Sequence, residues 1–197
     1  MDLMLDFETL DVGSMPALIS VGAVAFDPYV NDDFIDFERT IDAETCIKVG
    51  GSVSFSTIKW WMMQNQEARK KIYKPDTPAL SIEKVLLDIR DFIKDNKIKK
   101  VWGHGANFDP VLLDNYYKAL DIKVPFMYYN VRDTRTIFDL TGIKRTEITV
   151  KHNALEDARG QAIDVQRCCI GFKNLMQEVE RLQAEIAEMK NNAWRTT

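Results

Sequence analysis

The fold is decided by the stretch LMLDFETL, which occupies residues 3–10. Successive side chains of a β-strand point to opposite faces, so the two leucines and Phe7 share one face while Asp6 and Glu8 lie side by side on the other. The two acids come late in the strand, just before a loop at residues 11–14, and open α/β sheets bind ligands outside the carboxyl ends of their strands. We therefore predict a strand that carries two neighbouring carboxylates into a site.

Spacing alone does not single out this pair, because three Asp-x-Glu pairs occur where about one is expected by chance. The second pair lies in FIDFERTI, residues 34–41, whose apolar side chains share one face and whose acids share the other. That pattern is typical of a half-exposed strand, and the third pair follows it in what we interpret as a solvated turn. The three pairs are Asp6/Glu8, Asp36/Glu38 and Asp42/Glu44.

A helix start carries the next candidate residues, in KHNALEDA at residues 151–158. Asn153 is suited to the N-cap, and Glu156 three residues later predicts the reciprocal bond of a capping box. Asp157 then lies in the first helical turn and His152 just before the cap. The alternative is that His152 is a solvated loop residue and that Asp157 merely favours the helix dipole.

Asp109 follows an apolar strand that ends in a glycine-rich turn, in VWGHGANFDP at residues 101–110. A helix is predicted to begin near Pro110, since proline is tolerated in the first turn. An ordinary N-cap role for Asp109 is the alternative. His104 precedes Asp109 by five residues, as His152 precedes Asp157, and we interpret His104 as a structural or substrate-adjacent residue.

The order of these motifs resembles the DnaQ-like 3′–5′ exonucleases of the DEDDh type, which have a ribonuclease H-like fold. The matching segments are DFET at 6–9, NFD at 107–109 and H-x4-D followed by alanine at 152–158. Further similarity lies in ALISVGAVAFD, TIKWW and RDTRT. The tryptophan pair resembles a phage and bacterial subfamily often labelled exodeoxyribonuclease VIII-like, whose relatives include a mycobacterial exoribonuclease. The likeness covers roughly residues 1–170.

The resemblance implies that four acids hold two Mg²⁺ or Mn²⁺ ions, which prefer oxygen ligands. Asp6 is expected to bridge both ions, Glu8 and Asp157 to complete one site, and Asp109 to support the other mainly through water. His152 is expected to take the proton from the attacking water, a task that histidine suits near neutral pH.

The implied substrate is single-stranded or 3′-overhanging DNA or RNA, cut at its 3′ end to release nucleoside 5′-monophosphates. DNA is favoured over the alternative of an exoribonuclease. A non-catalytic nucleic-acid-binding or assembly module of the same fold is the second alternative. The retention of mutually repelling acids favours the enzyme, because a binding module has little reason to hold them together.

Substrate contacts are predicted from position. Trp60 and Trp61 are adjacent, so on a helix they point about 100° apart and only one of them joins the core. We expect Trp61 to be the tryptophan that stacks on a terminal base. The complete set of predicted contacts is Thr9, Leu10, Trp61, Asn107 and Phe108.

Periodicity predicts a three-layer α/β domain over residues 1–170, with a mixed sheet flanked by helices. We expect strands at 2–7, 18–26, 34–41, 99–103 and 126–129, and helices at 56–72, 79–95, 110–120, 134–140 and from 154 onward. Residues 171–197 form a predicted helical tail whose apolar residues recur at alternating steps of three and four. This tail either folds back on its own core or pairs with a second copy, as a homodimer.

Composition agrees with a protein that stays in the cytoplasm. No apolar run is long enough to cross a membrane and no basic leader precedes the first strand. The three cysteines are expected to be reduced. The net charge of −4 argues against broad electrostatic capture of a duplex, although an enzyme with a short footprint needs few phosphate contacts.

Overall fold

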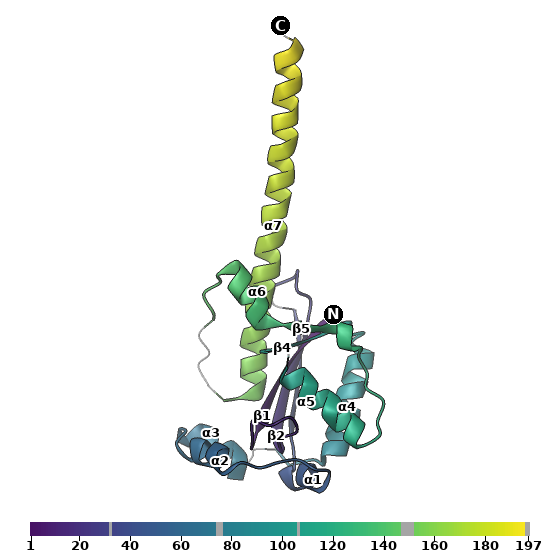
Figure 1. The fold of residues 1–197 in the computed structure, drawn as a ribbon, viewed down its shortest axis with the longest axis vertical. Helices are drawn as coiled ribbons and strands as arrows, with labels where there is room; N and C mark the ends of the chain where they lie inside the picture. Colours follow the sequence, from purple (N-terminus) through teal and green to yellow (C-terminus); the bar gives the residue numbers. More distant parts are fainter. Residues whose placement is uncertain (32, 74–76, 106, 147–151, 196–197) are drawn as a thin grey trace.

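The computed structural model describes residues 1–31, 33–73, 77–105, 107–146 and 152–195, and it contains a five-stranded mixed sheet (Figure 1). The strands lie in the order β3-β2-β1-β4-β5. β2 pairs antiparallel with β1 and β3, whereas β4 runs parallel to β1 and β5 parallel to β4. This arrangement confirms the predicted mixed sheet. The bounds are β1 Asp2–Thr9, β2 Leu18–Phe26, β3 Phe34–Thr40, β4 Lys100–Gly103 and β5 Val131–Asp133.

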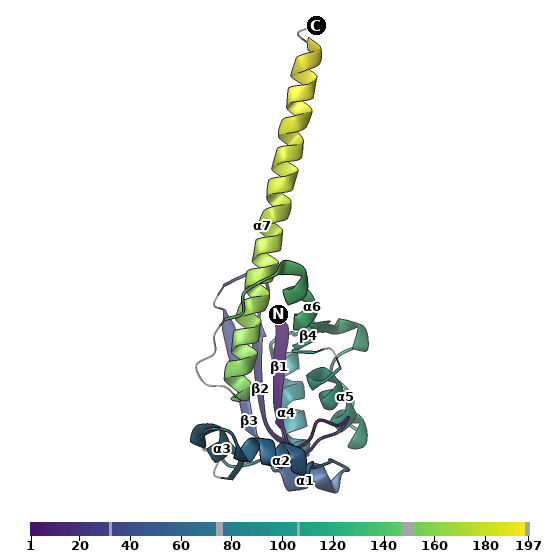
Figure 2. The same ribbon diagram turned by 60° about the vertical axis from the view of Figure 1, so that its left-hand side comes forward.

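Helices cover both faces of the sheet, which gives the three predicted layers (Figures 1 and 2). One face packs against α4 and α5, and the other against α6 and α7. The helices are α1 Ala43–Lys48, α2 Phe55–Met62, α3 Gln66–Tyr73, α4 Ile82–Asp95, α5 Asp109–Ala119, the short 3₁₀ helix η1 Tyr128–Asn130, α6 Thr134–Thr141 and α7 Ala154–Arg195.

The side-chain alternation of β1 is the one expected from its sequence. Leu3, Leu5 and Phe7 are buried in the core beneath α4 and α5, while Met4 is buried in the core beneath α7. Asp6 and Glu8 therefore project from the sheet on the side of α7. The central strand thus separates a hydrophobic face from a face that combines apolar and acidic side chains.

Gly22 lets the first turn of α7 rest directly on the sheet. It is the Cα partner of Asp6 across the β1–β2 ladder. A Cβ atom placed on Gly22 would lie 2.1 Å from the carbonyl carbon of Ala154 and from the backbone nitrogen of Leu155. Only a residue without a side chain permits this approach. The close contact brings the start of α7 beside Asp6.

Two predicted elements differ from the structure. The helix expected at 56–72 is broken into α2 and α3, because the side-chain oxygen of Asn65 accepts a hydrogen bond from the Ala68 N–H and so starts a new helix. The strand expected at 126–129 lies instead at Val131–Asp133, after η1. Pairing of Val131 with Val101 in β4 decides that position, and the aromatic side chain of Tyr128 remains exposed.

The predicted tail continues α7 without a break. α7 has 42 residues, and its C-terminal part projects away from the domain (Figure 1). Its large apolar side chains from Phe172 to Met189 are exposed, so this segment does not fold back on its own core. Among the described residues, no helix combines the length and the apolar content that crossing a bilayer requires.

Candidate active site

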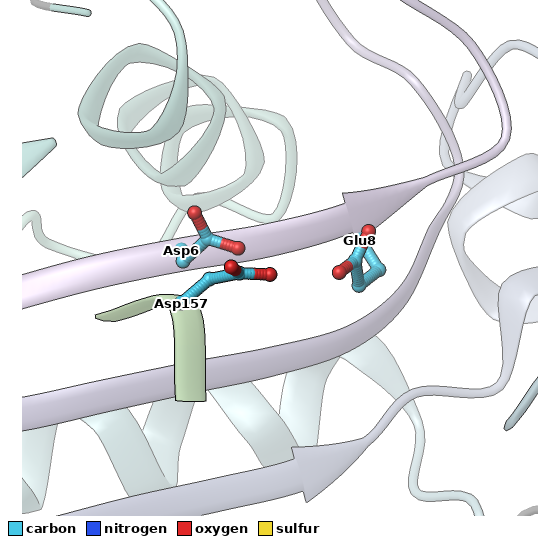
Figure 3. Close-up of side chains that lie close together, drawn as sticks. All are labelled: Asp6, Glu8 and Asp157. Carbon is cyan, nitrogen blue, oxygen red and sulfur yellow. The ribbon is translucent and has the colours of Figure 1, made fainter. Parts of the chain in front are cut away.

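Three acidic side chains meet where α7 begins (Figure 3). Asp6 and Glu8 come from β1, and Asp157 comes from the first turn of α7. One carboxylate oxygen from each lies within 4.8 Å of the others. All three residues are half-buried. Two segments separated by about 150 residues of sequence thus supply one cluster, as the motif order predicted.

Asp109 lies at the N-terminal end of α5 and outside this group of three. Its side chain is only 3% exposed, and its Oδ1 accepts a hydrogen bond of 3.0 Å from the backbone N–H of Phe7. β4 pairs only with Asp2, Leu3 and Met4 of β1, so this N–H lies beyond the paired part of that edge. Asp109 therefore holds the end of β1 in addition to placing a fourth negative charge near Asp6.

Burial and mutual repulsion disfavour the charged forms of these acids. Burial raises the pKa of Asp6 well above its ordinary value, and the charges of Asp109, Glu8 and Asp157 raise it further, against a hydrogen bond from Gln161. Burial also raises the pKa of Asp109, to about 6. The pKa of Asp157 is raised by burial and is partly restored by the Asn153 N–H and the charge of His152. Such a cluster of oxygen ligands fits a hard divalent cation, whose charge removes the repulsion.

Gln161 is a site residue that no motif in the sequence indicated. It lies one turn beyond Asp157 on α7, is 4% exposed, and its Nε2 donates to Asp6 Oδ1 at 3.1 Å. Its own Oε1 is buried and has no hydrogen-bond partner among the described residues. The helical step of four residues from Asp157 was the available signal, since positions i and i+4 share one face of a helix. Gln161 fixes the orientation of the Asp6 carboxylate.

The capping of α7 differs in one respect from the sequence prediction. Asn153 Oδ1 accepts from the Leu155 N–H at 3.2 Å, as an N-cap should. The second hydrogen bond of the capping box is made by Asp157, whose Oδ2 accepts from the Asn153 N–H at 3.2 Å. Glu156, predicted for this role, is exposed. The residue one position later takes the role because its side chain points back over the cap. One oxygen of Asp157 is therefore fixed by the helix start.

His152 lies against the tryptophan pair of α2. Its ring centroid is 4.7 Å from that of Trp60 and 6.0 Å from that of Trp61, both edge-on. Its backbone φ of 63° is in the left-handed region, which non-glycine residues seldom occupy. The structure thus brings His152 next to Asp157 between the acidic cluster and α2. Lys151, its neighbour in the motif, lies outside the described residues.

A pocket of ≈ 440 Å³ opens beside Glu8. It contains three of the predicted substrate contacts, namely Thr9, Trp61 and Phe108. Two others lie elsewhere: Leu10 is packed against the core, and Asn107 is an exposed turn residue that does not line the pocket. The same pocket is also lined by residues that were not predicted from the sequence, which are Phe7, Val12, Ser56, Thr57 and Trp60.

Trp61 is the buried tryptophan and Trp60 the exposed one, which is the reverse of the prediction. Trp61 is 3% exposed, and its indole N–H donates to the carbonyl of Thr9 at 2.9 Å. Trp60 is 43% exposed. The prediction that Trp61 is the more accessible of the two is wrong, because the end of β1 offers a buried carbonyl that an indole N–H satisfies. Trp61 fixes the strand end that follows Glu8.

The acids and the histidine that were not assigned to the catalytic motifs have structural roles. Asp36 forms an ion pair with Arg159 of α7, and Asp42 caps α1 by accepting from the Glu44 N–H at 3.0 Å. His104 accepts from Arg145 at 3.3 Å through Nε2 and is 2.8 Å from the Thr134 hydroxyl through Nδ1. Burial and the charge of Arg145 lower the pKa of His104 to about 4. These contacts agree with a structural function for each residue.

Comparison with known proteins decides the family. Residues 1–169 match the 3′–5′ exoribonuclease Rv2179c-like domain. The chain belongs to this family. It is also 30% identical over 161 aligned residues to the exodeoxyribonuclease of Enterobacteria phage T4, an alignment that covers 68% of this chain and 69% of the phage protein. This exonuclease domain also aligns with a full-length 3′-exonuclease crystal structure at a TM-score of 0.45 and 13% identity, over 84% of this chain and 79% of that one.

The family membership confirms the resemblance to DnaQ-like enzymes that the motif order indicated. The protein is a 3′–5′ exonuclease that acts on nucleic acid. Its family uses divalent metal ions, and the acidic cluster of Asp6, Glu8 and Asp157 is suited to hold them.

The contact between Gln161 and Asp6 predicts a selective effect on metal binding. The Gln161→Leu variant should bind Mn²⁺ about 10–100-fold more weakly in calorimetric titration of metal-free protein, because groups that orient metal ligands have effects of this size. Gln166→Leu is the matched control. Gln166 is buried on the same helix and donates to the carbonyls of Asp27 and Val30, so its loss should lower the free energy of unfolding by about 1–3 kcal/mol without changing Mn²⁺ affinity. Equal Mn²⁺ affinities in the two variants would contradict the orienting role.

The repulsion around Asp6 predicts that a neutral side chain stabilises the metal-free protein. The raised pKa means that the folded state binds protons more tightly than the unfolded state, so stability falls as pH rises through the folded-state pKa. Asp6→Asn should therefore increase the free energy of unfolding at pH 8 in chelator by on the order of 1 kcal/mol or more, and the gain should shrink as the pH is lowered toward 4. Asp95→Asn, at an exposed helix end, should change stability by less than about 0.5 kcal/mol. Urea denaturation at both pH values measures the effect, and a less stable Asp6→Asn protein at pH 8 would refute it.

Proposed function

We propose that the protein is a DEDDh-type 3′–5′ exonuclease that removes nucleotides from single-stranded or 3′-overhanging ends by a two-metal mechanism. The observation that carries this proposal is the close approach of Asp6, Glu8 and Asp157 beside a pocket lined by aromatic side chains. The products are nucleoside 5′-monophosphates.

The four acids have different proposed roles in holding the metal ions. Asp6, Glu8, Asp109 and Asp157 would hold two Mg²⁺ or Mn²⁺ ions, which would neutralise the phosphate and activate water for in-line attack. Asp6 would serve both ions, and Gln161 holds one of its oxygens. Glu8 and Asp157 would complete the ligands of one ion, and the buried Asp109 would support the other.

His152 is the general base of the proposal. It precedes the N-cap of α7, beside Asp157, and its ring is held between that helix start and Trp60. From this place it removes the proton of the attacking water as the phosphodiester bond is broken. The Asp157 carboxyl lies close to this ring, and their interaction partly offsets the raised pKa of Asp157.

The pocket beside Glu8 receives the terminal base. A base stacks on an aromatic side chain irrespective of sequence, and only an unpaired end exposes both faces of its last base. Trp60 supplies the exposed ring, and Phe108 and Thr9 line the same pocket. Trp61 holds Thr9 in place through the hydrogen bond from its indole N–H to the Thr9 carbonyl. Leu10 and Asn107 remain predicted contacts of the terminal nucleotide.

DNA is the preferred substrate in this proposal, and the phage exodeoxyribonuclease that shares 30% identity supports it. The exoribonuclease description of the family supports the alternative of an RNA-trimming enzyme. A location in the cytoplasm is consistent with the three cysteines, all of which are free thiols. Association of two copies through the C-terminal part of α7 completes the proposal.

Digestion of matched oligomers tests the activity and the substrate together. A 3′-labelled single strand of DNA should lose its label stepwise with Mg²⁺ or Mn²⁺, faster than the RNA of the same sequence, and should release nucleoside 5′-monophosphates. His152→Ala should lower turnover by about 10²–10⁴-fold, the usual contribution of a general base. Asp6→Ala should abolish release. Faster RNA digestion would assign the ribonuclease alternative, whereas equal release by wild type and Asp6→Ala would exclude the metal mechanism.

The exposed ring of Trp60 predicts a binding effect. Trp60→Ala should raise the KM for single-stranded oligomers by about 5–100-fold, since stacking of a base on an aromatic ring contributes about 1–3 kcal/mol. Phe55→Ala is the control, because Phe55 is an exposed aromatic residue of the same helix that does not line the pocket. Steady-state kinetics with a labelled DNA strand separates KM from kcat. An identical KM for both variants would remove Trp60 from the substrate site.

A further inference from the structure

The C-terminal part of α7 projects beyond the domain (Figure 2). An apolar stripe of exposed side chains runs along this part of the helix. Six large side chains form it, and their exposed fractions range from 36% for Val179 to 63% for Met189. They recur at steps of three and four residues, which places them at the a and d positions of a heptad repeat. The a positions are Phe172, Val179 and Ile186, and the d positions are Leu175, Leu182 and Met189.

The stripe continues a buried interface of the same helix. Val165 and Cys168 occupy the a and d positions of the preceding heptad, and both are buried under the sheet and α6. The domain thus covers this face of α7 as far as Cys168 and leaves it uncovered from Phe172 onward. Because the first half of α7 is already docked, the helix needs no separate nucleation before a partner packs on it.

We propose that a second copy of this chain covers the stripe, in an antiparallel two-helix coiled coil that spans residues 172–189. The inference rests on the self-association included in the proposed function and adds its surface, register and direction. Apolar residues that recur at the a and d positions form the seam along which helices pack in a coiled coil. A closed two-fold interface also requires a surface that is complementary to itself.

Self-complementarity is satisfied when the helices run in opposite directions and cross between residues 180 and 181. Each a residue then meets a d residue of the other copy. Phe172 packs on the partner's Met189, Leu175 on the partner's Ile186, and Val179 on the partner's Leu182. The two-fold axis repeats each contact, so all twelve side chains at the a and d positions are paired.

The direction follows from what the domain already occupies. A straight parallel partner in register would continue past Phe172 along Val165 and Cys168. That space is filled by the chain's own sheet and α6, since Cys168 Sγ lies 3.1 Å from the hydroxyl of Thr141. An antiparallel partner reaches this part of α7 only with its last residues, 190–195, which lie beyond the paired stripe. It also places the two catalytic domains at opposite ends of the pair.

The charged residues beside the stripe are compatible with this arrangement. Antiparallel packing brings Glu178 of one copy near the partner's Glu185. Arg181 of the same helix forms ion pairs with both Glu178 and Glu185, so each helix already compensates much of this charge.

Sedimentation equilibrium of the full chain tests the association. The wild type should have twice the 22.7 kDa mass of one chain, and Leu182→Glu should be monomeric. Gln177→Glu adds the same charge to an exposed position off the a and d stripe and should remain dimeric. Both variants should keep their activity on short single strands, because the catalytic domain is unchanged. A monomeric wild type, a larger oligomer, or a dimer that survives Leu182→Glu would overturn the inference, and the activity readout judges the nuclease proposal separately.

Disulfide trapping tests the direction. Co-expressed Leu175→Cys and Ile186→Cys chains, one of them tagged, should form a mixed cross-linked dimer on mild oxidation. Leu175→Cys alone should not cross-link, because its two copies would lie roughly 16 Å apart along an antiparallel pair, too far for a disulfide. The wild type controls for the native Cys46, Cys168 and Cys169. Efficient cross-linking of Leu175→Cys with itself would show a parallel pair and overturn the proposed direction.

Discussion

The architecture of the site depends on one close contact between backbones, where the first turn of α7 rests on β2 at Gly22. The absence of a side chain there allows the helix to approach the sheet beside Asp6 and to bring Asp157 to the acids of β1. The same helix supplies Gln161 to Asp6 one turn later. Any residue that separated α7 from the sheet would therefore move two groups of the site at once, together with the loop end that carries His152.

The acidic cluster is costly without a counter-charge, and the surrounding structure is arranged to hold it. Burial and mutual repulsion raise the pKa of Asp6 and Asp109, so the metal-free fold maintains these groups against electrostatic strain. Backbone N–H groups of Phe7 and Asn153 each fix one oxygen of an acid, and Gln161 fixes a third. One oxygen each of Asp6, Glu8 and Asp157 lies within 4.8 Å of the others, an arrangement that suits cations better than it suits the stability of the metal-free protein.

α7 serves two parts of the molecule. Its first half forms the core beneath the sheet and carries Asp157, whereas its second half leaves the domain with the same apolar stripe uncovered. The family match ends at residue 169, close to where the stripe becomes exposed. A single helix thus joins a catalytic domain to a surface suited to association, and no flexible linker separates the two functions. A rigid connection of this kind fixes the distance between two domains in an assembled pair.

Four of the five strands, the face on which Asp6 and Glu8 lie, and the order of motifs that indicates an exonuclease could be predicted from the sequence. These are local properties, since strand alternation and helix starts are encoded within a few residues. Tertiary structure alone decided that Trp61 is buried against Thr9 while Trp60 is exposed, and that the second hydrogen bond of the capping box is made by Asp157. It also decided that the tail projects instead of folding back. Such choices depend on which partner lies across the chain, and no local pattern records that partner.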